Sequence, residues 1–281
     1  MRPATDILLK SKNLKIRPLT TTDLENIYQL QPEGWSDITY FFKFYVEHPF
    51  CYPVIALMDN DIAGVANAIL NQDTGWISHV IVSENFRNRG IGTRITKTVS
   101  DYLKLKGCHT QSLIATEEGE RIYLKLGFRS QCNYLFYKSK KLAITPDFSL
   151  IRKINKNDLD EISRLDKEVT GESRIALLQY FFKSGWVYTG NSTGRIAGFY
   201  LPELGEGHII AEKNEAGLQL LIMKHYRKVN TTVIPEENLT ARKFLEMNDF
   251  QFHRSAPRMI LGRGFSWKPE KIFSRSGGFY G

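Results

Sequence analysis

A basic turn with two glycines, Arg87-Asn88-Arg89-Gly90-Ile91-Gly92, stands between a predicted strand and a predicted helix. Before it, two sets of side chains alternate through residues 76–82, which is the period of a strand. After it, apolar side chains recur every four positions up to Gly107 and predict an amphipathic helix: Ile91, Ile95, Val99 and Leu103. The first N–H groups of a helix have no intrahelical partner, and glycines let a ligand approach them closely. The turn is therefore expected to bind an anion such as phosphate.

Two other phosphate-binding turns do not fit this stretch. A dinucleotide-binding turn has the order G-x-G-x-x-G and an acidic residue about 20 positions further on, but residues 106–115 contain no acidic residue. A P-loop needs a lysine directly after its glycines, whereas Thr93 and Arg94 follow Gly92. A tight turn with incidental arginines is the remaining alternative.

A second motif follows after one helix and one strand. Residues 113–116 are predicted to form a short strand, and residues 117–126 a short helix with an acidic first turn, closed by Gly127. Tyr123 lies on this helix. From its pattern alone, Tyr123 is a core aromatic on an amphipathic turn.

Together the two motifs resemble the GNAT superfamily of N-acetyltransferases. The order R-x-x-G-x-G in residues 87–92 resembles the coenzyme A pyrophosphate turn of that family, and Tyr123 to Phe128 resembles its Y-x-x-x-G-F signature. The resemblance implies acetyl-CoA as cosubstrate and no metal. It also implies an acyltransferase that moves the acetyl group to a primary amine by direct attack in a ternary complex.

The resemblance also assigns roles to residues. Tyr123 would protonate the leaving thiolate as general acid. The end of the strand would offer its backbone to the acetyl-pantetheine and the turn would wrap the pyrophosphate, so the expected cofactor-binding residues are Val80, Ile81, Val82, Arg87, Asn88, Arg89, Gly90, Ile91, Gly92 and Thr93. The segment 31–37 would wall the acceptor cleft.

Two further side chains are candidate substrate contacts, Trp35 in that wall and His79 on the strand. An amine must lose a proton before it attacks. His79, expected on the same strand face as Ile81, is a candidate base because the reference pKa of histidine is near 6.5. Glu84, a water chain, or a purely structural His79 are the alternatives.

The chain also repeats itself. Residues 16–30 match residues 151–165 at a constant offset, and residues 120–128 match residues 242–250. A repeat of this length indicates duplication of a whole domain. We therefore expect two GNAT-like α/β (α+β) domains, residues 1–142 and 143–281, joined through residues 140–149. Each would have a mixed, mostly antiparallel twisted sheet flanked by helices.

The second copy lacks the predicted chemistry. Residues 208–217 contain no R-x-x-G-x-G, Glu212 and Glu215 would repel a pyrophosphate, and Leu245 stands where the first copy has Tyr123. This half resembles the degenerate C-terminal domain of tandem GNAT proteins. It is expected to shape the acceptor site, which favours a small amine or an amino-acid derivative as acceptor.

Composition and charge limit the classes of protein to which this chain could belong. The net charge of +8 over 281 residues is spread over both halves, which argues against a nucleic-acid or ribosome-associated modifier. Cys51, Cys108 and Cys132 form no C-x-x-C pair, residues 1–6 start no secretory signal, and no apolar run has the length of a membrane span. A cytoplasmic enzyme is expected, with no oligomeric state indicated. The rival functions are a non-catalytic acyl-CoA sensor and an acetyltransferase acting on a protein.

Overall fold

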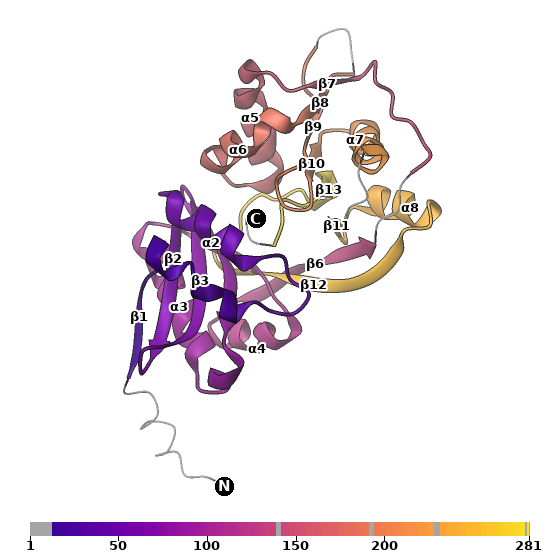
Figure 1. The fold of residues 1–281 in the computed structure, drawn as a ribbon. Helices are drawn as coiled ribbons and strands as arrows, with labels where there is room; N and C mark the ends of the chain where they lie inside the picture. Colours follow the sequence, from indigo (N-terminus) through magenta and orange to yellow (C-terminus); the bar gives the residue numbers. More distant parts are fainter. Residues whose placement is uncertain (1–12, 139–141, 191–193, 228–230, 279, 281) are drawn as a thin grey trace.

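The computed structural model describes residues 13–138, 142–190, 194–227, 231–278 and 280 (Figure 1). The start of the chain and part of the predicted linker therefore lie outside the described residues. In the first half, the strands are β1 (Leu14–Pro18), β2 (Cys51–Met58), β3 (Asp61–Asn71), β4 (Thr74–Val82), β5 (Thr110–Ile114) and β6 (Arg129–Lys138). The helices are α2 (Ile38–Glu47), α3 (Ile91–Leu105) and α4 (Glu117–Lys125), with 3-10 turns η1 (Thr21–Asp23), η2 (Ile27–Leu30) and η3 (Glu84–Phe86).

The second half has the same kind of elements, and its strands are short apart from the one over residues 251–262. The strands are β7 (Ile151–Lys153), β8 (Trp186–Tyr188), β9 (Gly198–Leu201), β10 (His208–Ala211), β11 (Thr232–Pro235), β12 (Gln251–Gly262) and β13 (Ile272–Ser274). Its helices are α5 (Leu159–Thr170), α6 (Ile175–Phe181), α7 (Asn214–Arg227) and α8 (Leu239–Met247), with 3-10 turns η4 (Lys156–Asp158), η5 (Phe182–Ser184) and η6 (Pro269–Lys271). None of the helices in the described ranges is long and apolar enough to cross a membrane.

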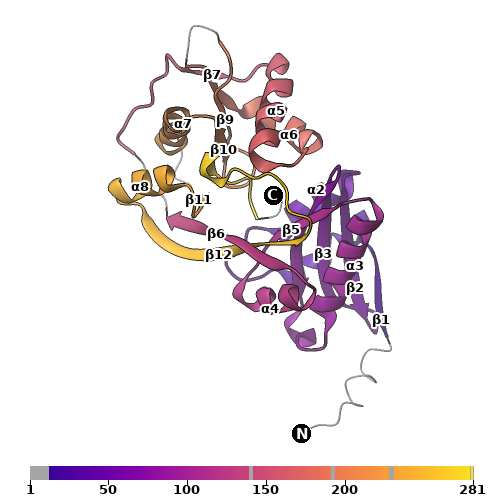
Figure 2. The same ribbon diagram turned by 180° about the vertical axis from the view of Figure 1, so that it is seen from behind.

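The elements form two β-sheets flanked by helices, which confirms the predicted α/β (α+β) fold class. An eight-stranded sheet has the order β1-β2-β3-β4-β5-β12-β6-β11, and a five-stranded sheet has the order β13-β10-β9-β8-β7. In the large sheet only β4 and β5 run parallel, and the other pairs are antiparallel. Helix α2 covers one face of this sheet and α3 the other (Figures 1 and 2).

Helix α3 confirms the predicted period. Its four apolar side chains, Ile91, Ile95, Val99 and Leu103, are all buried against the sheet, and Gly107 follows the helix with φ +86°. The period of 3.6 residues places these side chains on one face, so burial of this stripe determines how the helix lies on the sheet. The start of α3, which carries the basic turn, is therefore held firmly at the end of β4.

The repeat is visible as the same ion pair in both halves. Arg17 donates two bonds of 2.7 Å to Asp23, and Arg152 donates bonds of 2.7 and 2.9 Å to Asp158. Each pair closes the first strand of its half on the turn that follows. The two copies differ in the element that follows: turn η1 matches η4, but the first copy then forms only the short turn η2 where the second forms helix α5.

Two strands of the second half join the sheet of the first half. Strand β12, from the end of the chain, lies between β5 and β6, with Arg258 opposite Ile114 on one side and Cys132 on the other. Strand β11 extends the same sheet on β6. Along the sequence β6 is the last strand of the first half and β7 the first strand of the second, but the large sheet takes strands from both halves. Figure 1 shows β6 and β12 running side by side from the first half into the second.

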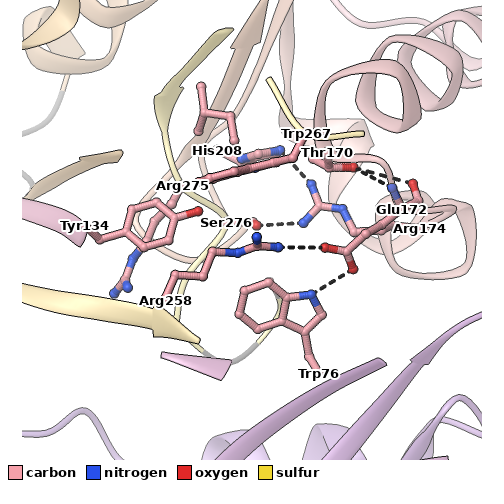
Figure 3. A pocket seen from close by; sticks show the side chains of 11 residues that line it. Trp76, Tyr134, Thr170, Glu172, Arg174, His208, Arg258, Trp267, Arg275 and Ser276 are labelled. Atoms are coloured by element: carbon pink, nitrogen blue, oxygen red, sulfur yellow. Dashed lines mark hydrogen bonds and ion pairs between the residues drawn. The ribbon is translucent and has the colours of Figure 1, made fainter. Parts of the chain in front are cut away.

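A buried carboxylate binds the halves together at this point (Figure 3). Glu172, 2% exposed and placed after α5, accepts hydrogen bonds from Trp76 Nε1 at 2.8 Å and Asn71 Nδ2 at 3.1 Å. It also accepts one from Thr74 Oγ1 at 3.3 Å and pairs with Arg258 Nη2 at 3.4 Å. Arg258 in turn lies over the ring of Trp76, 5.1 Å from its centroid. A buried charge is tolerated only with partners of this kind.

The same cluster continues into the second half. Arg174 donates bonds of 2.9 and 2.6 Å to Asp166, and its guanidinium also reaches Ser276 and His208. A cavity of about 10 Å³ lies among these side chains, which is room for about one water molecule. Its size and its paired charges indicate a structural junction.

Glu172→Ala should lower the free energy of unfolding by about 3–5 kcal/mol, because it leaves the Arg258 guanidinium buried without its carboxylate. The matched control is Glu168→Ala, which removes a half-exposed carboxylate paired with Arg164 and Lys268 and should cost less than about 1 kcal/mol. Urea unfolding of both variants measures the difference. Equal losses would show that Glu172 is not a junction between the halves.

Candidate active site

Strands β4 and β5 separate where the predicted site begins. Their ladder is confined to three pairs, Thr74 with Thr110, Gly75 with Gln111, and Trp76 with Ser112. On its other edge β5 pairs with β12 over its whole length, from Thr110 opposite Gly262 to Ile114 opposite Arg258. The last residues of β4 therefore have a backbone edge that β5 does not use, and such an edge can bind an extended ligand by strand-like hydrogen bonds.

A β-bulge at His79 changes the course of β4. Ser78 lies opposite Asn67 and Ile81 opposite Val65, so two residues of β4 face one residue of β3, and His79 has φ +47°. Trp76 and Ile81 consequently lie in the same apolar cluster, on the α2 side of the sheet. The strict alternation predicted for residues 76–82 is therefore wrong beyond Ser78. A non-glycine residue at positive φ stores strain that recurs at functional sites.

The basic turn connects β4 to α3 as a solvent-exposed loop. Asn88 and Gly90 have φ of +61° and +77°, and Gly90 caps α3 without any side-chain acceptor for the first N–H groups. Backbone of alternating handedness turns successive N–H groups toward one point, which suits an anion. Arg87 pairs with Glu84 at 3.4 Å, and Arg89 lies over the ring of Phe86. The arrangement fits a pyrophosphate group.

Two glycines allow the surrounding elements to meet closely. A Cβ at Gly92 would lie 3.1 Å from Ile122 Cδ1 of α4 and 3.5 Å from Val82 Cγ2 of β4. A Cβ at Gly64, opposite Val82, would lie 2.6 Å from the carbonyl oxygen of Ile81. The start of α3, the end of β4 and helix α4 therefore converge, which brings the predicted cofactor-binding residues together.

Tyr123 on α4 lies where the start of α3, the end of β4 and α4 meet. It is 8% exposed and lies in the same apolar cluster as Val80 and Val82, and its ring meets that of Phe128 edge-on at 6.0 Å. Within the described part of the chain, its hydroxyl has no hydrogen-bond partner. Burial raises the pKa of Tyr123 above its ordinary value of 10.0, so the hydroxyl keeps its proton at physiological pH and can donate it.

His79 is buried on the α2 side, under the predicted acceptor wall. Its Nδ1 lies 2.8 Å from the hydroxyl of Tyr45, and its ring lies 6.0 Å from Trp35 and 4.9 Å from Phe41. Burial lowers the pKa of His79 to about 3, so the ordinary value assumed from the sequence is wrong. A neutral imidazole of this kind takes up a proton poorly at pH 7. The structure places Trp35, 41% exposed, against His79.

A groove of about 460 Å³ lies between α2 and the second half. Its lining comes from both repeats: Tyr40, Phe181, Pro202, Glu203, Gly205, Glu206 and Thr231. On α2, Phe41 and Phe44 pack against Tyr280, at 6.4 and 5.5 Å between ring centroids. The sequence analysis missed these second-half residues, because no motif marks a loop that reaches another domain.

The fold and the site define a mixed α/β protein whose first half has a glycine-bearing turn at the start of α3 and a buried tyrosine on α4. The model of the acetyltransferase (GNAT) family matches residues 20–128, which include both motifs. The chain therefore contains a domain of the acetyltransferase (GNAT) family over these residues. A search of the curated proteins finds no match to the sequence.

Solved structures share the fold of the whole chain. A proposed acetyltransferase from Pyrococcus horikoshii has a TM-score of 0.81 at 19% identity, over 96% of both chains. A GCN5-related N-acetyltransferase from Sphaerobacter thermophilus has a TM-score of 0.61 at 14% identity, over 91% of this chain and 98% of that one. A tandem GNAT protein from the clavulanic acid biosynthesis pathway has 0.60 at 12%, over 90% and 99%. The two-domain GNAT architecture is therefore shared by other proteins.

The buried neutral histidines should make stability depend on pH. His79 and His225 have a pKa of about 3 when folded and about 6.5 when unfolded. Below pH 6.5 the unfolded chain binds protons that the folded chain does not, so the free energy of unfolding falls as the pH falls toward 3. Each histidine contributes up to about 1.4 kcal/mol per pH unit.

His79→Gln should therefore flatten this slope between pH 6.5 and 5 by about the share of one histidine. Urea unfolding at several pH values measures it. His253→Gln, at an exposed position of β12, is the control and should keep the wild-type slope. An unchanged slope in His79→Gln would mean that His79 is protonated in the folded chain.

Proposed function

We propose that this chain transfers the acetyl group of acetyl-CoA to a primary amine of a small molecule. The observation that carries the proposal is the convergence of Tyr123, the separated end of β4 and the uncapped start of α3 in one domain. A protein that only sensed acyl-CoA would need the turn but not a buried, protonated hydroxyl beside it.

The binding of acetyl-CoA would use the backbone more than side chains. The N–H groups of residues 88–93 would bind the pyrophosphate, with Arg87 and Arg89 supplying positive charge at an exposed loop. The free edge of Val80, Ile81 and Val82 would bind the pantetheine arm. A backbone N–H of this edge would stabilise the negative charge that develops on the carbonyl oxygen.

The transfer itself would proceed by direct attack. The nitrogen of the neutral amine forms a bond to the acetyl carbon, the carbon–sulfur bond breaks, and the departing thiolate takes the hydroxyl proton of Tyr123. The proton that the amine gives up returns to the site through water and restores Tyr123. His79, neutral at pH 7, would line the acceptor side together with Trp35 and would not be the base.

The acceptor would enter from the α2 side. The groove beside α2 has a volume typical of small-molecule sites. Its walls come from both halves, which supports a small acceptor over a protein tail. The three cysteines, all buried and free, support a reducing, cytoplasmic location.

Gly90→Ala should weaken acetyl-CoA binding by about tenfold or more, because the new methyl group would stand among the N–H groups that bind the pyrophosphate. A Cβ at Gly90 meets no described atom within 4 Å, so the cost to the fold is the strain of an alanine at φ +77°. Gly107→Ala is a matched control, with a similar positive φ and equally open surroundings at the other end of α3. Calorimetry on both folded variants measures the affinities, and equal affinities would contradict the assignment of the turn.

Tyr123→Phe should reduce turnover by roughly 10²–10⁴ with little change in acetyl-CoA affinity, because it removes only the proton donor. Its hydroxyl has no described partner in the fold, so the variant should keep the stability of the wild type. The loss should shrink for acyl donors with a more acidic thiol, which leave without help. Wild-type turnover across that series of donors would make Tyr123 a core aromatic only.

A further inference from the structure

Two arginines flank one aromatic ring at the junction of the halves. The Cζ of Arg254, on β12, lies 3.7 Å from the ring centroid of Phe136, and that of Arg275, just after β13, lies 4.7 Å from it. Arg275 also lies 5.5 Å from the ring of Tyr134, the neighbouring aromatic on the same face of β6. Both guanidinium groups therefore lie over the same aromatic ring, and cation–π attraction helps to hold them there.

The positive charge at this point is only partly compensated. Glu206 binds Arg275 at 2.6 and 3.1 Å, but Arg254 forms no ion pair or hydrogen bond with any described residue. Arg275 is 5% exposed, and its Nη1 has no partner among the described groups. Such a buried donor is costly unless a ligand or water accepts its hydrogen bond.

A buried lysine adds to the excess. Lys224 donates hydrogen bonds to Ser274 Oγ at 2.9 Å and to the carbonyl oxygen of Thr231 at 3.0 Å. Burial lowers the pKa of Lys224 to about 7, and Glu206 acts in the opposite direction. The single carboxylate of Glu206 is thus matched against the charged guanidinium groups of Arg254 and Arg275. The partly protonated amine of Lys224 adds further positive charge.

The cluster adjoins the proposed acceptor site. Glu206 and Thr231 line the groove whose opposite wall is Tyr40 of α2. The aromatic cluster of Tyr134 and Phe136 packs on Ile114, at the end of β5 where β4 and β5 separate. Along β12, Arg254 lies four residues from Arg258, the partner of Ile114, or about 13 Å. Because an arginine side chain is long, the guanidinium group of Arg254 can lie nearer to the end of β5 than its backbone does.

We propose that Arg254 and Arg275 bind an oxyanion of the acceptor, so that the acceptor carries a primary amine at one end and a carboxylate or phosphate at the other. The planar guanidinium fork matches both oxyanions and discriminates against uncharged groups. The inference rests on the proposed function, because it names the chemical class of the acceptor for the same site.

The kinetic test compares acceptors that differ only in charge. Linear ω-amino carboxylates of increasing length, ω-aminoalkyl phosphates and the matching ω-amino amides are offered to the full chain with acetyl-CoA. The wild type should prefer an anionic acceptor of suitable length by about tenfold or more in kcat/KM. In Arg254→Gln the KM for that acceptor should rise to the value of the amide, with kcat and the amide kinetics little changed.

Two further variants make the result specific. Arg254→Lys should recover part of the preference, because it keeps the charge and loses the fork. Arg242→Gln, which removes an exposed arginine of α8 paired with Glu246, should leave the preference intact. A wild type that uses acids, phosphates and amides equally would overturn the proposal, as would an equal effect of the Arg242 variant.

A binding measurement separates this inference from the proposed function. Glutarate and inorganic phosphate, without acetyl-CoA, should raise the melting temperature of the wild type but not that of Arg254→Gln. If this difference is found and no amine is acetylated, the oxyanion site stands and the proposed function fails. If amines are acetylated but neither anion distinguishes the two proteins, the function stands and the oxyanion site is wrong.

Discussion

The pairing of β12 with β5 and β6 is the constraint on which the rest of the structure depends. It places a strand from the end of the chain beside the predicted site, with Arg258 opposite Ile114 and above Glu172. Strand β12 occupies the other edge of β5, while β4 leaves β5 after Trp76 and keeps a free edge at its end. The candidate site and the junction between the halves thus lie on opposite edges of β5.

The comparison of the two repeats separates what the fold needs from what the chemistry needs. The backbone bond from Phe128 to the carbonyl of Tyr123 recurs from Phe250 to Leu245, both at 3.0 Å. Asp249 takes the positive φ of Gly127. The second copy therefore keeps the turn after its helix without the tyrosine, so the hydroxyl is not required for folding. Its presence in the first copy supports a chemical role.

Much of the site could be predicted from the sequence because it depends on local patterns. The stripe of α3 and the positions of Gly90, Gly92 and Tyr123 follow from spacing within a few residues, and the structure places them together. The ion pair of Arg17 and Asp23 likewise recurs in both halves because the repeat preserves it.

The features that were missed depend on distant parts of the chain. A bulge adds one residue to a strand and shifts which side chains share a face. No residue type in the sequence marks the bulge at His79, so the sequence was interpreted as an uninterrupted strand. The pKa of His79 follows from burial under α2, which spacing does not reveal. The insertion of β12 and the groove residue Glu206 depend on how two repeats pack, and either repeat alone permits a different pairing.

A crystal structure of the full chain with coenzyme A tests the central claim most directly. The account predicts one molecule per chain, with its pyrophosphate on the N–H groups of residues 88–93 and its sulfur beside Tyr123, between the ends of β4 and β5. No molecule is expected at the start of α7, which follows β10 after only two residues. A molecule bound at α7, or one whose sulfur lies away from Tyr123, would contradict the account.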